Sequence, residues 1–149
     1  MGRATTHPTN ALSRFITAQT ATYDSAMAEL RRGAKTGHWM WFVFPQIAGL
    51  GHSPTARLYA IADLTEARAY LAHPVLGPRL IDAVEAINAL PGHDAHAVFG
   101  APDDLKLRSS LTLFRAADPD EPAFQRALDK YFDGEADPLT LARLRDTSA

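Results

Sequence analysis

Proline placement is the feature that most constrains how this chain can fold. At four points a proline follows a residue able to cap or lead a helix: Ser53-Pro54, His73-Pro74, Asp120-Glu121-Pro122 and Asp137-Pro138. Proline is tolerated in the first turn because its missing N–H would have no intrahelical partner there, and Ser or Asp can accept from the free donors that follow. These four points therefore predict four helix starts.

Mostly apolar residues between these points recur at the three- and four-residue steps of one helix face. In a first helix, predicted over residues 10–32, that face consists of Leu12, Phe15, Ile16, Gln19, Tyr23, Met27 and Leu30. Spacing and punctuation predict further helices over residues 54–62, 65–72, 74–90, 94–99, 102–114, 122–132 and 138–145.

The run from His38 to Phe44 is continuous and short, so periodicity cannot assign it. We expect a short buried helix there, because no hairpin pattern offers a partner for a strand. The prediction is one all-α domain over residues 1–149, an irregular bundle of about six to eight helices with little or no sheet. Residues 1–9 and 146–149 are expected to be flexible tails.

Composition narrows the function classes. The absence of cysteine excludes a disulfide framework, a Cys-based zinc site and a thiol nucleophile, and it suits a reducing compartment. A formal charge of -2 gives the whole molecule no attraction to nucleic acid or anionic membranes, so neither is expected as a partner. No apolar run approaches the roughly 18 residues of a membrane span, and the polar N-terminus lacks a secretion signal. A cytoplasmic location is the default expectation.

The most informative segment is Lys35–Pro54, which holds both tryptophans. Trp39 and Trp41 can wall a flat ligand, although large aromatic side chains mostly fill cores. The turn Gly49-Leu50-Gly51-His52-Ser53-Pro54 opens into a predicted helix, whose first N–H groups and dipole favour an anion. The alternative is that Ser53 simply caps this helix.

Residues near this turn in sequence could complete a site. Lys35, His38 and Arg57 could supply positive charge, and Gln46 could read an amide or a base edge. The turn is neither a Walker loop nor a dinucleotide-binding fingerprint.

A second polar cluster spans residues 103–112. Asp103 and Lys106 can form a surface ion pair at i,i+3, but hydroxyls at Ser109-Ser110 need partners if they face inward. If this cluster packs against the His38 region, Lys106 and Ser109 would join Lys35 and His38 around one polar pocket.

Metal and hydrolase chemistry have no matching motif. His93 and His96 lack an acidic third ligand at helical spacing, and no H-E-x-x-H or G-x-S-x-G motif occurs. We therefore expect no metal and no cofactor.

The chain resembles a bacterial family of uncharacterised proteins, the domain of unknown function 1810 family. The resemblance covers nearly the whole chain and rests on Arg14-Phe15, Gln19, Tyr23, Lys35, residues 38–46, Gly49-Leu50-Gly51, Ser53, Tyr59, Tyr70-Leu71, residues 73–77, Arg79-Leu80, Phe99-Gly100, Asp104, Lys106-Leu107, Ser109-Ser110, residues 112–114 and residues 128–132. Leu111 replaces a methionine frequent in the family. The resemblance implies an all-helical single domain and brings no established activity, cofactor or catalytic residue. The name calpastatin, sometimes attached to the family, does not suit a compact helical domain.

Two functional hypotheses follow. The first is a binding protein or enzyme for a small phosphate- or carboxylate-bearing ligand, such as a nucleotide derivative, with His38 as acid or base. Its ligand-binding residues are Lys35, Trp39, Trp41, Gln46, Gly49, Gly51, Ser53, Lys106 and Ser109. The second is a non-enzymatic interaction module, monomeric or homodimeric, that uses an exposed aromatic patch of the same segment. Nucleic-acid binding through Arg31, Arg32 and Lys35 is disfavoured by the acidic balance.

Overall fold

The computed structural model describes residues 7–148, with side chains from Leu12 to Asp146. Its helices are α1 (His7–Arg32), α2 (Met40–Val43), α3 (Pro54–Leu58), α4 (Leu64–Ala72), α5 (Leu76–Asn88), α6 (Ala95–Phe99), α7 (Asp103–Ala117), α8 (Pro122–Phe132) and α9 (Pro138–Ser148). Within residues 7–148 these nine helices are accompanied by a single β-bridge and no longer strand. The all-α prediction is confirmed.

The helices start where the capping pattern predicts, because side chains there accept from the first amides. Ser53 Oγ accepts from Ala56 N at 3.1 Å. Asp137 Oδ2 accepts from Thr140 N at 2.9 Å. At His73-Pro74 the helix begins slightly later, at Leu76, and the His73 imidazole Nδ1 accepts from Val75 N at 3.0 Å. The His73 side chain thus accepts a backbone hydrogen bond of the kind that Ser53 and Asp137 accept at their helix starts.

Several predicted helix boundaries were wrong. The helix from Pro54 ends at Leu58 rather than at residue 62, because the chain turns to form a parallel bridge between Ile61 and Ile47. Helix α7 continues past residue 114 to Ala117. Residues 7–9 and 146–148, expected to be tails, are helical backbone here, whereas residues 1–6 and 149 lie outside the described residues.

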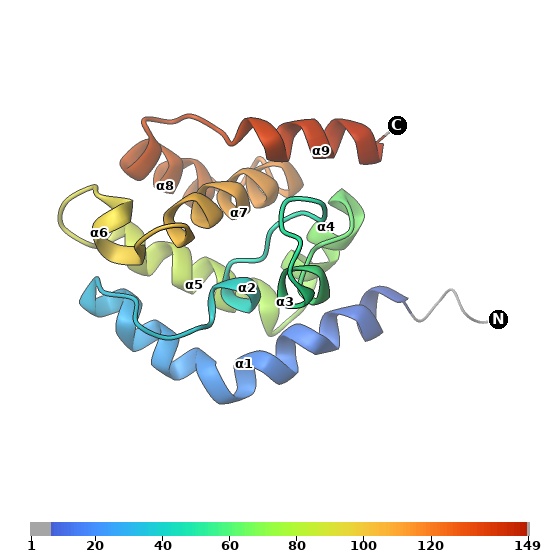
Figure 1. Ribbon diagram of the computed structural model, residues 1–149, viewed down its shortest axis with the longest axis horizontal. Coiled ribbons are helices and arrows are strands. Elements are labelled where there is room, and N and C mark those ends of the chain that lie inside the picture. Colours follow the sequence, from blue (N-terminus) through green and yellow to red (C-terminus); the bar gives the residue numbers. More distant parts are fainter. Residues whose placement is uncertain (1–6, 149) are drawn as a thin grey trace.

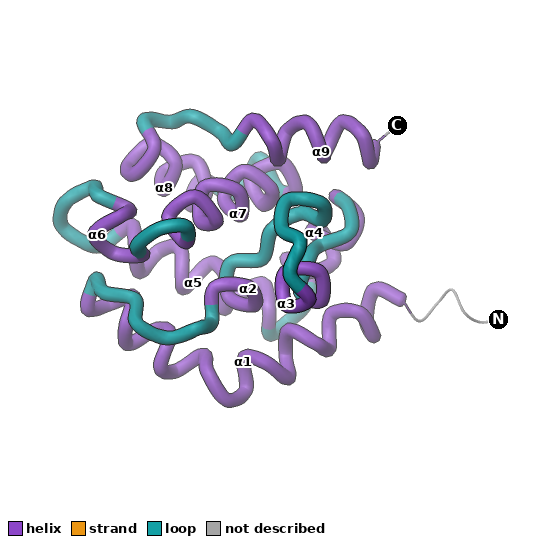
Figure 2. Tube along the Cα trace, in the orientation of Figure 1, coloured by secondary structure: helices purple, strands orange, loops and turns teal. Residues whose placement is uncertain are grey.

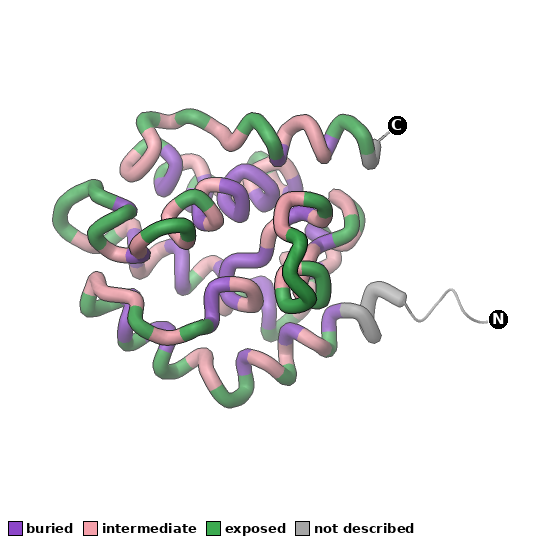
Figure 3. The backbone as a smooth tube through the Cα atoms, viewed as in Figure 1, coloured by how far each residue is buried: buried purple, intermediate pink, exposed green. Residues whose placement is uncertain are grey.

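The core is organised around a chain of aromatic rings. Phe15 of α1 meets Tyr70 of α4 with centroids 5.2 Å apart, and Tyr70 meets Phe114 of α7 at 5.3 Å. Phe114 in turn lies 6.0 Å from Phe124 of α8. Figure 1 shows α1 and α9 on opposite sides of the molecule with α5, α7 and α8 between them. The buried residues concentrate in that middle layer (Figure 3).

Gln19 explains why one polar side chain lies on the apolar face of α1. Its Nε2 donates to the Phe42 carbonyl at 2.7 Å and to the Tyr70 hydroxyl at 3.1 Å, and the residue is 1% exposed. Burial raises the pKa of the Tyr70 phenol well above its usual range. Gln19 therefore fixes α2 and α4 onto α1.

The loop of residues 44–53, between α2 and α3, positions the candidate site (Figure 2). Ile61 N donates to the Gln46 carbonyl at 2.8 Å, and Ala48 N donates to the Ile61 carbonyl at 2.8 Å. These two hydrogen bonds attach Gln46 and Ala48 of the loop to Ile61, which follows α3. None of the described helices is long and apolar enough to cross a membrane.

Candidate functional site

A buried carboxylate anchors the segment that precedes α2. Glu29 Oε1 accepts from Thr36 N at 2.7 Å, Gly37 N at 2.8 Å and the Trp39 indole at 2.9 Å. Desolvation raises the pKa of Glu29, but these hydrogen bonds to the charged form outweigh it and lower the pKa to about 2. Sequence reasoning missed Glu29; the available signal was a carboxylate next to the buried Leu30 at the end of α1.

This anchoring places Trp39 in the core, where it is 2% exposed. Its ring packs near Phe44, with centroids 6.3 Å apart. Gly37 is required here, because a Cβ at that position would lie 2.9 Å from Trp39 Cδ1. His38, between them, points to solvent.

Three charged residues link this segment to α7. Lys35 Nζ lies 2.8 Å from Asp103 Oδ2, and its side chain is only 7% exposed. Lys106 Nζ lies 3.5 Å from the other oxygen of Asp103 and 4.7 Å from the centre of the Trp41 ring. One carboxylate therefore serves two ammonium groups, which leaves one positive charge in excess. That excess is best assigned to Lys106, which is the more exposed lysine and the more distant from its carboxylate.

The turn before α3 differs from the expected anion site. Ser53 Oγ accepts from Ala56 N, and the Ser53 carbonyl accepts from Arg57 N at 3.0 Å. Helix α3 has only five residues, so few peptide dipoles align at its start. The capping alternative thus describes Ser53, and the anion hypothesis has to rest on side chains.

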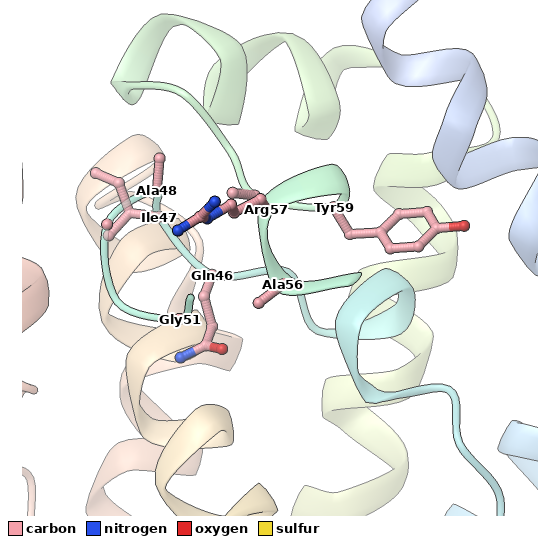
Figure 4. Close-up of a pocket in the computed structure, with 9 residues that line it drawn as sticks. Gln46, Ile47, Ala48, Gly51, Ala56, Arg57 and Tyr59 are labelled. Carbon is pink, nitrogen blue, oxygen red and sulfur yellow. The ribbon is translucent and has the colours of Figure 1, made fainter. Parts of the chain in front are cut away.

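An inner pocket lies between the 44–53 loop and α3, with a volume of about 130 Å³. Its lining residues are Gln46, Ile47, Ala48, Gly49, Gly51, Ala56, Arg57, Tyr59 and Ala60. The loop packs closely against α3 beside this pocket, because a Cβ on Gly51 would lie 2.6 Å from that of Ala56. In Figure 4 the Arg57 side chain extends toward Ala48, whereas the Tyr59 ring points away.

An outer groove of about 380 Å³ lies on the other side of the same loop, against the starts of α7 and α9. Its lining residues are Gln46, Leu50, Gly51, Pro102, Leu105, Lys106, Arg108, Ser109, Asp137, Pro138 and Leu139. Gln46 and Gly51 thus belong to the walls of both hollows. Figure 4 shows the Gln46 amide extending away from Arg57.

The structure brings part of the predicted set together. Gln46, Gly49, Gly51, Lys106 and Ser109 line one hollow or both, so the loop and α7 form walls of the same groove, without Lys35 and His38. The linings of these two hollows do not include Lys35, His38, Trp39, Trp41 and Ser53. Their roles as ligand contacts, and that of His38 as acid or base, stay predictions.

Two lining residues of the outer groove, Arg108 and Asp137, were missed. Arg108 donates to the carbonyls of Glu135 and Ala136, each at 2.9 Å. Asp137 Oδ2 accepts from Ser109 Oγ at 3.2 Å and from the Thr140 hydroxyl at 2.6 Å. The Asp137-Pro138 helix start was visible in the sequence, but nothing local indicated that α9 would pack beside Ser109.

Ser109 Oγ donates a hydrogen bond to the Asp137 carboxylate, and no histidine is among the residues that line either hollow. Among the described residues no group of three or more His, Asp or Glu could hold a metal ion.

Comparison with known proteins gives two matches. The family model described as "Protein of unknown function (DUF1810)" matches residues 9–144. The chain is also similar to the crystal structure of the conserved hypothetical protein Rv1873 from Mycobacterium tuberculosis, with 50% sequence identity and a TM-score of 0.89. That match covers 90% of this chain and 96% of the other. Proteins of curated function give no match.

Proposed function

The chain belongs to the DUF1810 family, described as proteins of unknown function, and from the geometry of its loop we propose that it binds a small organic anion. The binding region comprises the outer groove and the inner pocket on either side of Gln46 and Gly51. The ligand would carry a carboxylate or phosphate group, as in a nucleotide derivative.

The observation that carries this proposal is the surplus charge at Lys106. Asp103 is closer to Lys35, at 2.8 Å, than to Lys106, at 3.5 Å. The Lys106 ammonium is positioned by the Trp41 ring beneath it, and its charge is only partly neutralised. An incoming anion would complete its pairing.

The rest of the groove supports a ligand with an apolar part. Leu50, Leu105 and Leu139 line it together with two cations and one carboxylate, so its net charge is positive. Ligand sites commonly combine apolar walls with a few placed polar groups. Arg108 already donates to the Glu135 carbonyl, and Asp137 already accepts from Ser109, both near the start of α9. Lys106 and Gln46 are therefore the side chains available to contact a ligand.

Calorimetry and thermal shift with inorganic phosphate, nucleoside monophosphates and short carboxylates test the proposal. We expect at least one anion to raise the melting temperature of the wild type, and Lys106→Gln to weaken that binding by about tenfold, the loss expected for one charged hydrogen bond. Lys130→Gln is the matched control, because Lys130 also lies near an aromatic ring, 5.4 Å from that of Tyr131, yet lines neither hollow. Equal loss in both variants, or no binding of any anion, would refute the proposal.

A second candidate is an interaction surface at the same groove. Leu105 is 60% exposed and Leu139 is 66% exposed, and both lie on its rim. Of the two tryptophans expected in an exposed aromatic patch, Trp39 is buried and Trp41 is partly exposed, so this hypothesis now rests on Trp41 and the two leucines. Light scattering of the wild type and of Leu139→Asp separates the candidates: a dimer that the substitution dissociates would favour an interface.

A further inference from the structure

The two hollows differ in what they offer a ligand, and each contains one available cation. In the outer groove that cation is Lys106, whose carboxylate partner is shared with Lys35. In the inner pocket it is Arg57, the only charged residue in that lining. Arg57 is exposed, and its side chain makes no hydrogen bond or ion pair with any of the described residues.

The residues shared by both hollows carry no charge. Gln46 and Gly51 line both, and Ala56 packs against Gly51, where a Cβ would lie 2.6 Å from the Ala56 Cβ. The Gln46 backbone is fixed by the bond from Ile61 N at 2.8 Å, whereas its side-chain amide makes no hydrogen bond within the described part of the chain. An amide left free beside two hollows can donate to and accept from the same ligand.

We infer that the ligand carries two separated anionic groups, one bound by Arg57 in the inner pocket and one by Lys106 in the outer groove. The linking part of the ligand passes Gln46, which lines both hollows and whose amide contacts it. This inference rests on the proposed function and adds a ligand class to it: a compact dicarboxylate, a bisphosphate or a molecule with one group of each kind. A guanidinium suits the first group, because its fork pairs with a carboxylate or phosphate through two parallel bonds.

Two-point binding makes a clear quantitative demand. Once one anionic group is bound, the second meets its cation at a high local concentration, provided that the linker has the right length. Affinity should therefore peak at one linker length, and the two cations should act together rather than independently.

The test uses two probe series, linear dicarboxylates from butanedioate to octanedioate and the corresponding bisphosphonates, each beside its monoanionic counterpart. We expect one length to bind at least about tenfold more tightly than its counterpart. Arg57→Gln and Lys106→Gln should each abolish that preference, and the double variant should lose little more than either single variant. Arg68→Gln is the matched control, because Arg68 is exposed on α4 and lines neither hollow.

The outcomes separate the inference from the proposed function. If single anions bind through Lys106 but neither series prefers its dianionic member, the ligand-binding function holds and the inference is refuted. If dianions are preferred and Arg57→Gln leaves the preference intact, the inference is also refuted. If no member of either series binds but another small anion does, only the inference is refuted; if no anion of any kind binds, both are refuted. Circular dichroism of each variant shows that the fold is retained, as expected for substitutions at partly or fully exposed side chains.

Discussion

At the scale of single residues, Glu29 does the most for the site without lining it. One of its oxygens accepts three hydrogen bonds, two from backbone amides and one from the Trp39 indole. The carboxylate accepts hydrogen bonds from two backbone amides of the turn. Its charged form is favoured, because a protonated carboxyl group would be a weaker acceptor for these bonds. The segment leading into α2 therefore depends on a negative charge.

The lowered pKa of Glu29 predicts a pH dependence of stability. Its folded pKa of about 2 lies below the ordinary value of 4.5, so its contribution is full above pH 4.5 and is lost as the pH falls toward 2. Urea unfolding between pH 7 and pH 3 should show this loss in the wild type and a flatter profile in Glu29→Gln. That variant should also lose about 1–3 kcal/mol at pH 7.

Glu135→Gln serves as the control, because the Glu135 side chain is 76% exposed and its ion pair with Arg108 is 3.6 Å long. Identical pH profiles for the wild type and Glu29→Gln would contradict the assigned role of Glu29.

At the scale of elements, close contact between α4 and α5 depends on Gly77. A Cβ there would collide with the Leu71 carbonyl oxygen, which belongs to the helix before the turn. Helix propensity alone would favour alanine by about 1 kcal/mol. We expect the collision to dominate, with Gly77→Ala lowering the free energy of unfolding by about 1–3 kcal/mol. Chemical denaturation measures this, and a stabilised variant would show that the two helices can separate at little cost.

Helix α9 is fastened to α7 by a hydroxyl. Thr112 Oγ1 donates to the Arg108 carbonyl at 2.8 Å and accepts from Asp137 N at 2.9 Å. Thr112→Val keeps the shape but leaves the Asp137 amide without a partner, so it should cost about 1–3 kcal/mol. Thr112→Ser retains the hydroxyl and should lose clearly less. Denaturation of the pair decides the matter: a larger loss in Thr112→Ser than in Thr112→Val would mean that the methyl group, and not the hydrogen bond, matters.

At the scale of the whole molecule, the ring chain from Phe15 to Phe124 joins four helices through one core. A single core predicts a single cooperative transition. Tryptophan fluorescence, which reports on Trp39 and Trp41 near α2, should change at the same denaturant concentration as far-UV circular dichroism, which reports on all helices. Separate midpoints would indicate that the α2 segment unfolds on its own.

The helical architecture could be predicted from the sequence because its signals are local. Proline after a capping residue and a 3.6-residue apolar period depend only on neighbours in the chain. The end of α3 could not be predicted, since it depends on the pairing of Ile61 with Ile47. A prediction from neighbouring residues cannot identify the distant residue with which a segment pairs.

The candidate site was predictable to a similar extent. Gly51 could be suspected from the glycine-flanked turn before Pro54, Gln46 from its place beside that turn, and Lys106 and Ser109 from the polar cluster of residues 103–112, and all four line one groove. Lys35 was assigned to the anion but is occupied by Asp103. Tertiary packing decides which of the two lysines lies closer to the Asp103 carboxylate. Tertiary packing also brings α9 close to Ser109.

The bond pair between Ile61 and the 44–53 loop has one further consequence. Because the backbone of Gln46 and Ala48 is fixed before any ligand arrives, the backbone of the loop that both hollows share is pre-organised, and little of its conformational entropy remains to be lost on association. Free and occupied forms should then superimpose closely, and variation in affinity among ligands should reside mainly in how fast each one leaves.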